Sequence, residues 1–179
     1  MKSEEFTELC NTRSYSSWNR GKLTNYWEKA GLSISDILAN KNKLDKQSMN
    51  MAVLGSVGKS TLVKVLSTLL HNNNQSYYVT KVNDNWLPQL PLAVELAIRS
   101  KANLCVFECG VASRGDATLM ASVVPADIVV YTEFTEVNLS QLGSLGGIIE
   151  EKTQFVLQHP EARVISHIAN QKQLQKRGL

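Results

Sequence analysis

The sequence predicts an α/β fold, in which helices cover both faces of a mostly parallel sheet. From residue 49 onward, short apolar segments alternate with amphipathic segments of helical length, which is the pattern of repeated βαβ units. A turn containing glycine joins the first apolar segment directly to the first amphipathic one. The 179 residues, 43% of them hydrophobic and 20% charged, suit one globular domain with a sizeable core.

Residues 1–48 are predicted to form a helical N-terminal extension and linker, ahead of a main domain at residues 49–179. Apolar residues recur at helical spacing in two places, so two short helices are expected there. They are Leu23, Tyr26, Trp27 and Ala30 in the first and Ile34, Ile37 and Leu38 in the second. Ser33 or Ser35 is suited to cap the second helix. We expect the aromatic residues to pack on the sheet, and the Lys- and Asn-rich residues 40–48 to be a linker.

Within the main domain, strands and helices are expected in strict alternation. The apolar or β-branched segments predicted as strands are residues 49–54, 77–82, 104–109, 127–134 and 162–165. The segments with helical periodicity are residues 59–70, 90–100, 116–123 and 144–157. The polar and basic tail, residues 171–179, is typical of a solvated helix end or a frayed terminus.

The composition argues against several classes of function. The net charge is only +3, and no block of Lys or Arg precedes the last residues, so nucleic-acid binding is not expected. No apolar stretch has the length of a membrane span, and none follows the N-terminal residues as in a secretory signal. The three cysteines, Cys10, Cys105 and Cys109, fit neither a disulfide framework nor a zinc site, so we expect a cytoplasmic protein.

A phosphate-binding loop is predicted between the first strand and the first helix of the main domain. Its residues are Gly55, Ser56, Val57, Gly58, Lys59, Ser60 and Thr61. Glycines let backbone N–H groups turn towards an anion, and the helix that follows adds unpaired N–H groups and a positive dipole end. Lys59 would neutralise phosphate charge and Ser60 would bind Mg²⁺. Val53 replaces the first glycine of the general G-x-x-x-x-G-K-[ST] pattern, and an ordinary strand-to-helix turn is the alternative interpretation.

This shortened loop and the segments after it resemble the Mur ligase superfamily, whose members form amide bonds at the expense of ATP. Besides the loop, the resemblance is carried by residues 83–92, 106–112, 124–130 and 139–155. It spans roughly residues 49–170 and is greatest to the branch that adds a D-alanyl-D-alanine unit to a cell-wall precursor. It implies a P-loop NTPase-like fold, corresponding to the first two thirds of the family's central ATP-binding domain.

The resemblance also implies ATP and Mg²⁺ as cofactors and gives roles to single residues. Lys59 would be catalytic, and Glu108 would bind Mg²⁺ together with Ser60, although a plain loop or capping carboxylate is also consistent with its position. Lys152 would be the second catalytic residue, because it matches the lysine that the family carbamylates to hold another Mg²⁺. The acidic residues beside Lys152 fit equally well with a solvated, charged helix face.

Asn138 is the main departure from the family pattern. It stands where the family has a histidine ligand for the second metal ion; Asn138 can offer a carbonyl oxygen to Mg²⁺ there, but as a weaker, neutral ligand. Residues 132–136 differ as well, and Glu133 or Glu136 would be the available substitutes. Arg114 and Asp116 are expected in an exposed loop. The three histidines, His71, His159 and His167, are expected at the surface without a role.

Two functions remain open from the sequence. The first is an ATP-dependent carboxylate–amine ligase that activates a carboxylate as an acyl phosphate. The N- and C-terminal domains that family enzymes carry would then be supplied by a partner protein, or by the rest of a longer chain of which this is a fragment. The second is a nucleotide-binding or regulatory relative without ligase activity, which the altered residue 138 favours. A GTPase or kinase is disfavoured, because Asn40-Lys41-Asn42-Lys43 lacks the Asp of a guanine-reading motif.

Overall fold

The centre of the computed structural model, which describes residues 4, 6–8, 22–81 and 84–179, is a sheet of five parallel strands. The strands are β1 (Met49–Leu54), β2 (Tyr77–Val79), β3 (Leu104–Glu108), β4 (Ile128–Tyr131) and β5 (Arg163–Ser166). Their order across the sheet is β2-β3-β1-β4-β5. Because β3 and β4 flank β1, the carboxyl end of β1 is the point where the chain order reverses, and ligands bind at such points in open α/β sheets.

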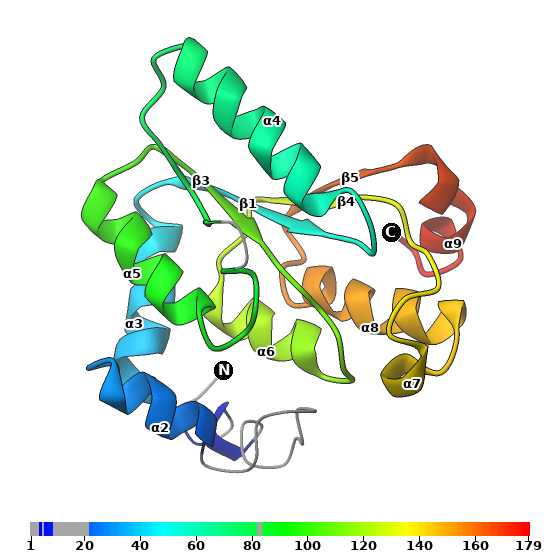
Figure 1. Ribbon diagram of the computed structural model, residues 1–179, viewed down its shortest axis with the longest axis horizontal. Helices are drawn as coiled ribbons and strands as arrows, with labels where there is room; N and C mark the ends of the chain where they lie inside the picture. Colours follow the sequence, from blue (N-terminus) through cyan, green and yellow to red (C-terminus); the bar gives the residue numbers. More distant parts are fainter. Residues whose placement is uncertain (1–3, 5, 9–21, 82–83) are drawn as a thin grey trace.

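Helices cover both faces of this sheet (Figure 1), which confirms the predicted fold class. On one face lies α4 (Lys59–Asn72), which contacts β1, β2 and β3. On the other lie α5 (Leu90–Ser100), α6 (Asp116–Val123) and α8 (Leu145–Leu157). The shorter elements are α2 (Lys22–Lys29), α3 (Ile34–Asp45), α7 (Leu139–Leu142), the 3-10 helix η1 (Ile168–Asn170) and α9 (Gln171–Gln175). No helix within the described residues is long and apolar enough to span a membrane.

The sheet separates two cores of unequal size. The smaller core lies beneath α4, where Val63 packs with strand residues that include Val53 and Val106. The larger core lies beneath α5, α6 and α8, and Ala52 belongs to it. Because side chains alternate along a strand, the neighbours Ala52 and Val53 enter different cores. Burial on both faces explains why β1 is apolar almost throughout rather than alternating.

The N-terminal helices α2 and α3 form a third layer outside the sheet (Figure 1). Helix α3 contacts α5 and α6. This segment therefore packs on the helical layer, whereas packing directly on the sheet was expected. Ser33 caps α3, since the Asp36 N–H donates to its Oγ at 3.2 Å and its own N–H donates to Asp36 Oδ2 at 2.9 Å. Of the two serines expected as caps, Ser33 is therefore the one that serves.

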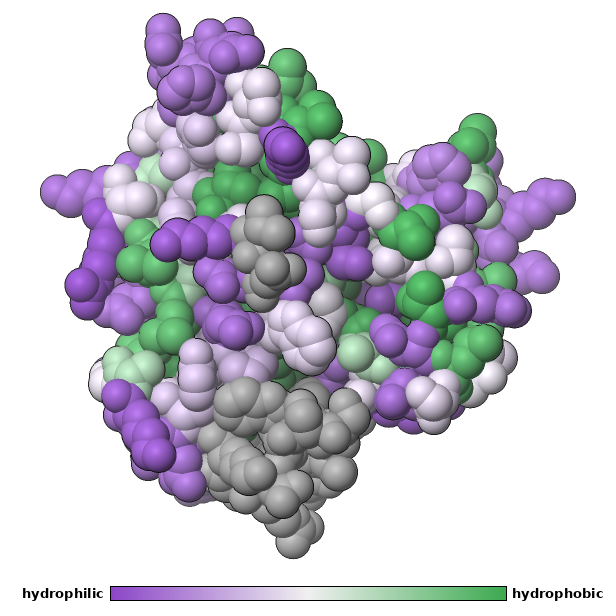
Figure 2. Space-filling model, in the orientation of Figure 1, coloured by the Kyte–Doolittle hydropathy of each residue, from purple (hydrophilic) through white to green (hydrophobic). Residues whose placement is uncertain are grey.

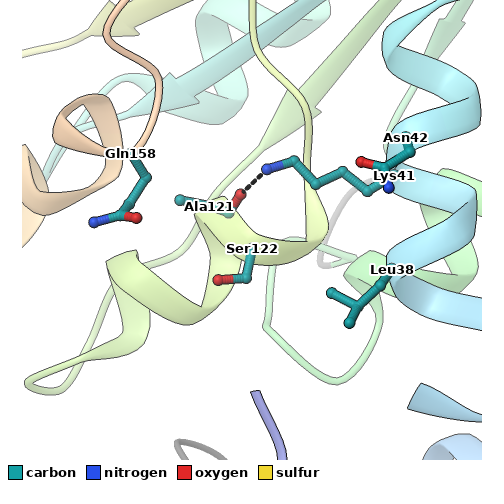
Figure 3. Close-up of a pocket in the computed structure, with 6 residues that line it drawn as sticks. All are labelled: Leu38, Lys41, Asn42, Ala121, Ser122 and Gln158. Carbon is teal, nitrogen blue, oxygen red and sulfur yellow. Dashed lines mark hydrogen bonds between the residues drawn. The ribbon is translucent and has the colours of Figure 1, made fainter. Parts of the chain in front are cut away.

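The predicted linker at residues 40–48 is helical as far as Asp45, so this expectation was wrong for most of the segment. Leu44 is buried, and the ammonium of Lys41 donates to the carbonyl of Ala121 near the C-terminus of α6 at 2.7 Å. Figure 3 shows Lys41 extending from α3 across a small polar pocket to that carbonyl. A cation is favourable at a helix C-terminus, so a Lys-rich stretch here ties two helices together. Polar composition alone does not reveal such docking.

Beyond this segment, the clearest differences from the predictions concern β2, β4 and the C-terminal tail. β2 ends at Val79, and Val82 of the predicted strand lies outside the described residues, as does Cys10. β4 ends at Tyr131 and not at residue 134, because the Phe134 N–H donates to Asn170 Oδ1 at 3.1 Å as the chain leaves the sheet. The tail is ordered into α9 by the buried side chain of Leu174.

Candidate functional site

The predicted loop, residues 55–61, lies at the carboxyl end of β1, between the ends of β3 and β4. Glu108 is the last residue of β3, and Thr132 directly follows β4. The loop contacts the segment after β4, since the N–H groups of Ser56 and Val57 both donate to the carbonyl of Glu133, at 2.9 and 3.4 Å. Three separate parts of the sequence therefore meet at the point where the chain order reverses.

The start of α4 supplies backbone donors for an anion. Gly58 has φ +83° and leads into the helix without a side-chain cap. The first helical hydrogen bond is donated by Leu62 to the Gly58 carbonyl at 3.0 Å. The N–H groups of Lys59, Ser60 and Thr61 therefore have no acceptor in the helix, and with the helix dipole they favour a bound phosphate.

Lys59 folds back over the loop. Its ammonium donates to the carbonyl of Gly55 at 3.1 Å and to that of Ser56 at 3.4 Å. Burial lowers the pKa of Lys59, while the negative charge of Glu108 opposes the shift. A phosphate at the loop would attract this ammonium more strongly than two neutral carbonyls do, so Lys59 is held ready for an anion.

Ser60 and Glu108 are brought together as predicted, and Asn85 joins them. The hydroxyl of Ser60 donates to Glu108 Oε1 at 2.9 Å, and Asn85 Nδ2 donates to the same oxygen at 2.8 Å. Glu108 is only 3% exposed, which excludes a solvated loop carboxylate. Sequence reasoning missed Asn85, because an Asn in a polar segment between strands is typical of a turn.

These residues fit a magnesium ion by the nature of their donors. The buried Asn85 Oδ1 has no hydrogen-bond partner, so an acceptor oxygen is left beside the Ser60–Glu108 pair. Within the described residues there is no group of three or more His, Cys, Asp or Glu side chains that could enclose a metal ion. The donors present are one carboxylate, one hydroxyl and one amide oxygen, and Mg²⁺ is commonly held by one or two carboxylates together with phosphate oxygens and water.

Lys152 lies in the same pocket as the loop. This pocket has a volume of about 180 Å³ and its lining includes Gly55, Lys59, Asn85, Asn138 and Lys152. Lys152 is 1% exposed and its ammonium donates to the carbonyl of Val111 at 3.0 Å, so the alternative of a solvated helix face is excluded. Burial, assisted by the nearby charge of Lys59, lowers the pKa of Lys152 to about 8. An appreciable fraction of this amine is therefore neutral near physiological pH.

Asn138 lines this pocket without taking part in the Ser60–Glu108 contact. It precedes α7 with a left-handed backbone, φ 55° and ψ 35°, which Asn tolerates better than most residues. Its side chain is exposed and makes no capping bond to the helix. Glu133, one of the suggested substitutes for the family histidine, is exposed and meets the loop through its backbone carbonyl.

Asp116 is buried beneath the pocket. The expectation that it is an exposed loop residue was wrong. It is 4% exposed, and its Oδ2 accepts the N–H groups of Ala112 at 2.9 Å and Ser113 at 2.8 Å. Its Oδ1 is buried without a partner. Burial, with a contribution from the charge of Glu151, raises the pKa of Asp116 to about 6. Arg114, by contrast, is exposed as predicted.

Replacement of Asp116 by Asn is expected to stabilise the fold at neutral pH. Because the folded-state pKa exceeds the ordinary aspartate value of 3.8, the carboxyl group favours folding most at low pH, and this contribution is lost as pH rises through about 6. Asn carries no charge and keeps an acceptor oxygen, so the gain at neutral pH should approach about 3 kcal/mol and vanish near pH 4. Urea unfolding at both pH values measures it. Equal stability changes at both pH values would contradict the expectation.

One of the three histidines differs from its predicted surface position. His159 is partly buried, and its two ring nitrogens lie 3.1 Å from the carbonyls of Phe155 and Val124. Burial, followed by the charge of Lys41, lowers its pKa, and the ring lies between α8 and the end of α6. His71 and His167 are exposed. His159 lies in contact with α6 and is not among the pocket residues.

Comparison with known proteins places this geometry in one family. Residues 53–178 match the family model described as the Mur ligase middle domain. The UDP-N-acetylmuramoyl-tripeptide–D-alanyl-D-alanine ligase of Bacillus subtilis is 27% identical over 166 residues, covering 88% of this chain and 35% of that protein. The ligase of the same name from Borreliella burgdorferi is 27% identical over 118 residues, covering 66% of this chain and 25% of that protein. This chain thus spans about a third or less of these relatives.

Solved structures share the fold. A MurF ligase from Thermotoga maritima, in complex with ADP, matches with a TM-score of 0.70 and 20% identity, covering 92% of this chain and 38% of that one. A MurF from Acinetobacter baumannii matches with a TM-score of 0.65 and 15% identity, covering 86% of this chain and 38% of that one. At these identities the likeness concerns the fold, which agrees with the parallel sheet and the loop described above.

Proposed function

We infer that this chain, which belongs to the Mur ligase family through its middle domain, binds Mg-ATP at residues 55–61 and serves a cytoplasmic carboxylate–amine ligation. The observation that carries the proposal is the convergence of Lys59, Lys152 and Asn138 in one pocket beside the free N–H groups of α4. The ADP bound to the Thermotoga maritima relative supports the choice of nucleotide.

The residues of the loop would bind the phosphates by charge and by backbone donors. Lys59 exchanges its bonds to two loop carbonyls for bonds to phosphate oxygens, while the first N–H groups of α4 hold the same anion. Ser60, Glu108 and Asn85 are the residues that would hold Mg²⁺, whose contribution when bound is to neutralise the charge of the phosphates. The chain thus orients the terminal phosphate towards the pocket.

The proposed reaction has two steps. A substrate carboxylate oxygen bonds to the γ-phosphorus as the bond to the β–γ bridging oxygen breaks and ADP leaves. A substrate amine then bonds to the acyl carbon as phosphate leaves and the amine loses a proton, giving the amide. Because the chain spans 35% of its Bacillus subtilis relative, we assign the remaining substrate contacts to a partner protein or to parts of the protein beyond this chain.

Lys152 is proposed to carry a carbamate in this reaction. The neutral amine would attack carbon dioxide, forming an N–C bond and releasing one proton. Its depressed pKa, about 8, favours this step by supplying neutral amine. The resulting negative charge would hold a second Mg²⁺ near the phosphates, with Asn138 contributing only a neutral oxygen.

A second candidate function is nucleotide binding without ligation. The observation in its favour is Asn138, an exposed and neutral residue at the position of a metal-binding histidine in the family. If the second metal ion is not held, ATP would bind at the loop without transfer of its terminal phosphate. Such a protein would act through its nucleotide-bound state.

Calorimetric titration with Mg-ATP tests both proposals. We expect Lys59→Met to weaken binding by about tenfold to a hundredfold, the worth of a charge-assisted hydrogen bond. Lys64→Met is the matched control, since Lys64 is exposed on the same helix and should leave binding unchanged. Equal affinity of wild type and Lys59→Met would refute the role of the loop. Release of ADP on long incubation with a carboxylate and an amine favours ligation, and binding without ADP release favours the second function.

A further inference from the structure

A cluster of three buried charged side chains lies where the start of α6 meets the middle of α8. Charged side chains ordinarily lie at the surface, as the strongly hydrophilic residues spread over the face in Figure 2 do. Asp116, Glu151 and Lys152 differ, with exposed fractions of 4%, 7% and 1%. Within the described residues, the Lys152 ammonium forms no ion pair with either carboxylate. The partners that these groups have instead therefore define the role of the cluster.

The peptide group between Val111 and Ala112 connects Lys152 to Asp116. Its carbonyl accepts from the Lys152 ammonium at 3.0 Å, and its N–H donates to Asp116 Oδ2 at 2.9 Å. The same carboxylate oxygen accepts the N–H of Ser113 at 2.8 Å. Hydrogen bonds from backbone N–H groups to a carboxylate are strong, so the two together fix the orientation of this peptide. The Val111 carbonyl is thereby kept facing the lysine.

The rest of this region is fixed by separate bonds. The Tyr131 hydroxyl donates to the backbone carbonyl of Lys152 at 3.1 Å, and a backbone N–H of α6 donates to Glu151 Oε1 at 3.0 Å. Helix α8 is thereby tied to β4 and to α6. The segment that carries the Val111 carbonyl, by contrast, has no helix or strand of its own between β3 and α6. Its position next to the lysine therefore depends on the two bonds to Asp116.

The orientation of this carbonyl has a chemical consequence for a carbamate on Lys152. An ammonium has three N–H groups to donate, whereas a carbamate nitrogen is planar and keeps only one. The Val111 carbonyl is already in place as an acceptor for that one N–H. Once the N–H and the lysine chain occupy two of the three directions around a planar nitrogen, the third direction is fixed for the CO₂⁻ group. The space next to Lys152 is the pocket that Lys59 and Asn138 also line.

We propose that Asp116 is a positioning residue for the Lys152 side chain. It holds the Val111–Ala112 peptide so that the carbonyl accepts from the Lys152 nitrogen, in the carbamate as in the ammonium, and directs the CO₂⁻ group into the pocket. The part that concerns the carbamate rests on the proposed function. Asp116 acts through the placement of its oxygen and not through its charge, because a negative charge alone would oppose a second anionic group nearby.

Carbon-13 NMR of the protein in labelled bicarbonate tests the proposal. A carbamate signal that is absent from Lys152→Met identifies the modified residue. Asp116→Asn keeps an oxygen that can accept both N–H groups, so it should keep at least the carbamate fraction of the wild type. Asp116→Ala loses both bonds and should lower that fraction at least about tenfold. Loss of the carbamate in both variants, or in neither, overturns the proposal.

Two further variants separate positioning from a general loss of stability. Asp116→Ser is too short to reach both N–H groups but keeps a residue suited to a helix start, so it replaces Asp116→Ala if that variant does not fold by circular dichroism. Asp127→Ala is the matched control, because Asp127 Oδ2 also accepts a backbone N–H, that of Asn50 at 2.7 Å, and is not among the pocket residues. It should leave the carbamate unchanged, and loss of the carbamate in this control contradicts the proposal.

A second measurement does not depend on the carbamate. In buffer free of carbon dioxide, nitrogen-15 NMR of labelled lysine measures how fast the Lys152 ammonium protons exchange with water. Exchange should be slow in the wild type and in Asp116→Asn, and at least about tenfold faster in Asp116→Ala. Slow exchange without a carbamate in bicarbonate would refute the carbamate of the proposed function and support the positioning of the amine. Equal exchange in all three proteins would refute the positioning itself.

Discussion

Replacement of Gly55 by alanine is expected to cost about 2–5 kcal/mol of stability and to abolish binding of Mg-ATP. Gly55 has φ +137°, a backbone conformation that side chains with a Cβ rarely adopt. A Cβ built there would lie 2.0 Å from Thr132 Oγ1 and 3.1 Å from the Thr132 carbonyl carbon. Thr132 cannot withdraw easily, because its N–H and its hydroxyl both donate to the Leu54 carbonyl, at 2.9 and 3.1 Å.

The double variant Gly55→Ala with Thr132→Ala separates the clash with the Thr132 hydroxyl from the other two causes of lost stability, which are the backbone contact and the φ angle. It removes the hydroxyl contact but keeps the backbone contact and the unfavourable φ, so only part of the stability should return. Gly146→Ala is the control, because it lies in α8 with no atom closer than 3.6 Å to the added Cβ, and its stability should be unchanged or slightly raised. Urea unfolding and calorimetric titration measure the two effects. A stable Gly55→Ala variant that still binds Mg-ATP would show that the loop does not need this close approach.

The main elements were predictable because their signals are local. The bounds predicted for β1, α5 and α6 agree with the structure, since each is an apolar or periodic segment that ends at glycine, at polar residues or shortly before proline. The segment after β4 was misjudged for a different reason. Residues 132–134 continue the strand pattern in sequence, but the Glu133 carbonyl accepts from the N–H groups of the loop and the Phe134 N–H donates to Asn170. Tertiary partners decide where such a strand ends, and they leave no local signal.

The candidate site was only partly accessible from the sequence. The glycines, Lys59 and Ser60 follow one another along the chain, so their pattern states their role. Asn85 lies 23 residues before Glu108, and only the fold brings its amide to that carboxylate. The burial of Asp116 could not be predicted from the local sequence either, because a charged residue after a glycine is typical of a surface turn. What the pattern leaves out is the set of polar residues whose partners are distant in sequence.

The second large effect on stability is expected from replacement of Trp27, which lies far from the phosphate loop in sequence. Trp27 is 1% exposed, stacks on Phe6 with ring centroids 6.0 Å apart, and donates from Nε1 to the Pro88 carbonyl at 2.9 Å. Trp27→Ala should lower the free energy of unfolding by about 3–5 kcal/mol, because it leaves a large cavity and a buried carbonyl without a donor. That is a large fraction of the stability of an ordinary domain.

The hydrogen bond to Pro88 also connects the N-terminal helices to the site. Pro88 lies two residues after Trp86, which lines the pocket with Asn85, so loss of the bond should loosen that side and weaken Mg-ATP binding as well. Trp27→Phe keeps the stacked ring and should cost only about 1–3 kcal/mol. Trp86→Ala is the matched control for stability, since that indole is 53% exposed and should change unfolding by less than about 1 kcal/mol. If Trp27→Ala unfolds like wild type, the packing of Trp27 and its bond to Pro88 do not stabilise the domain.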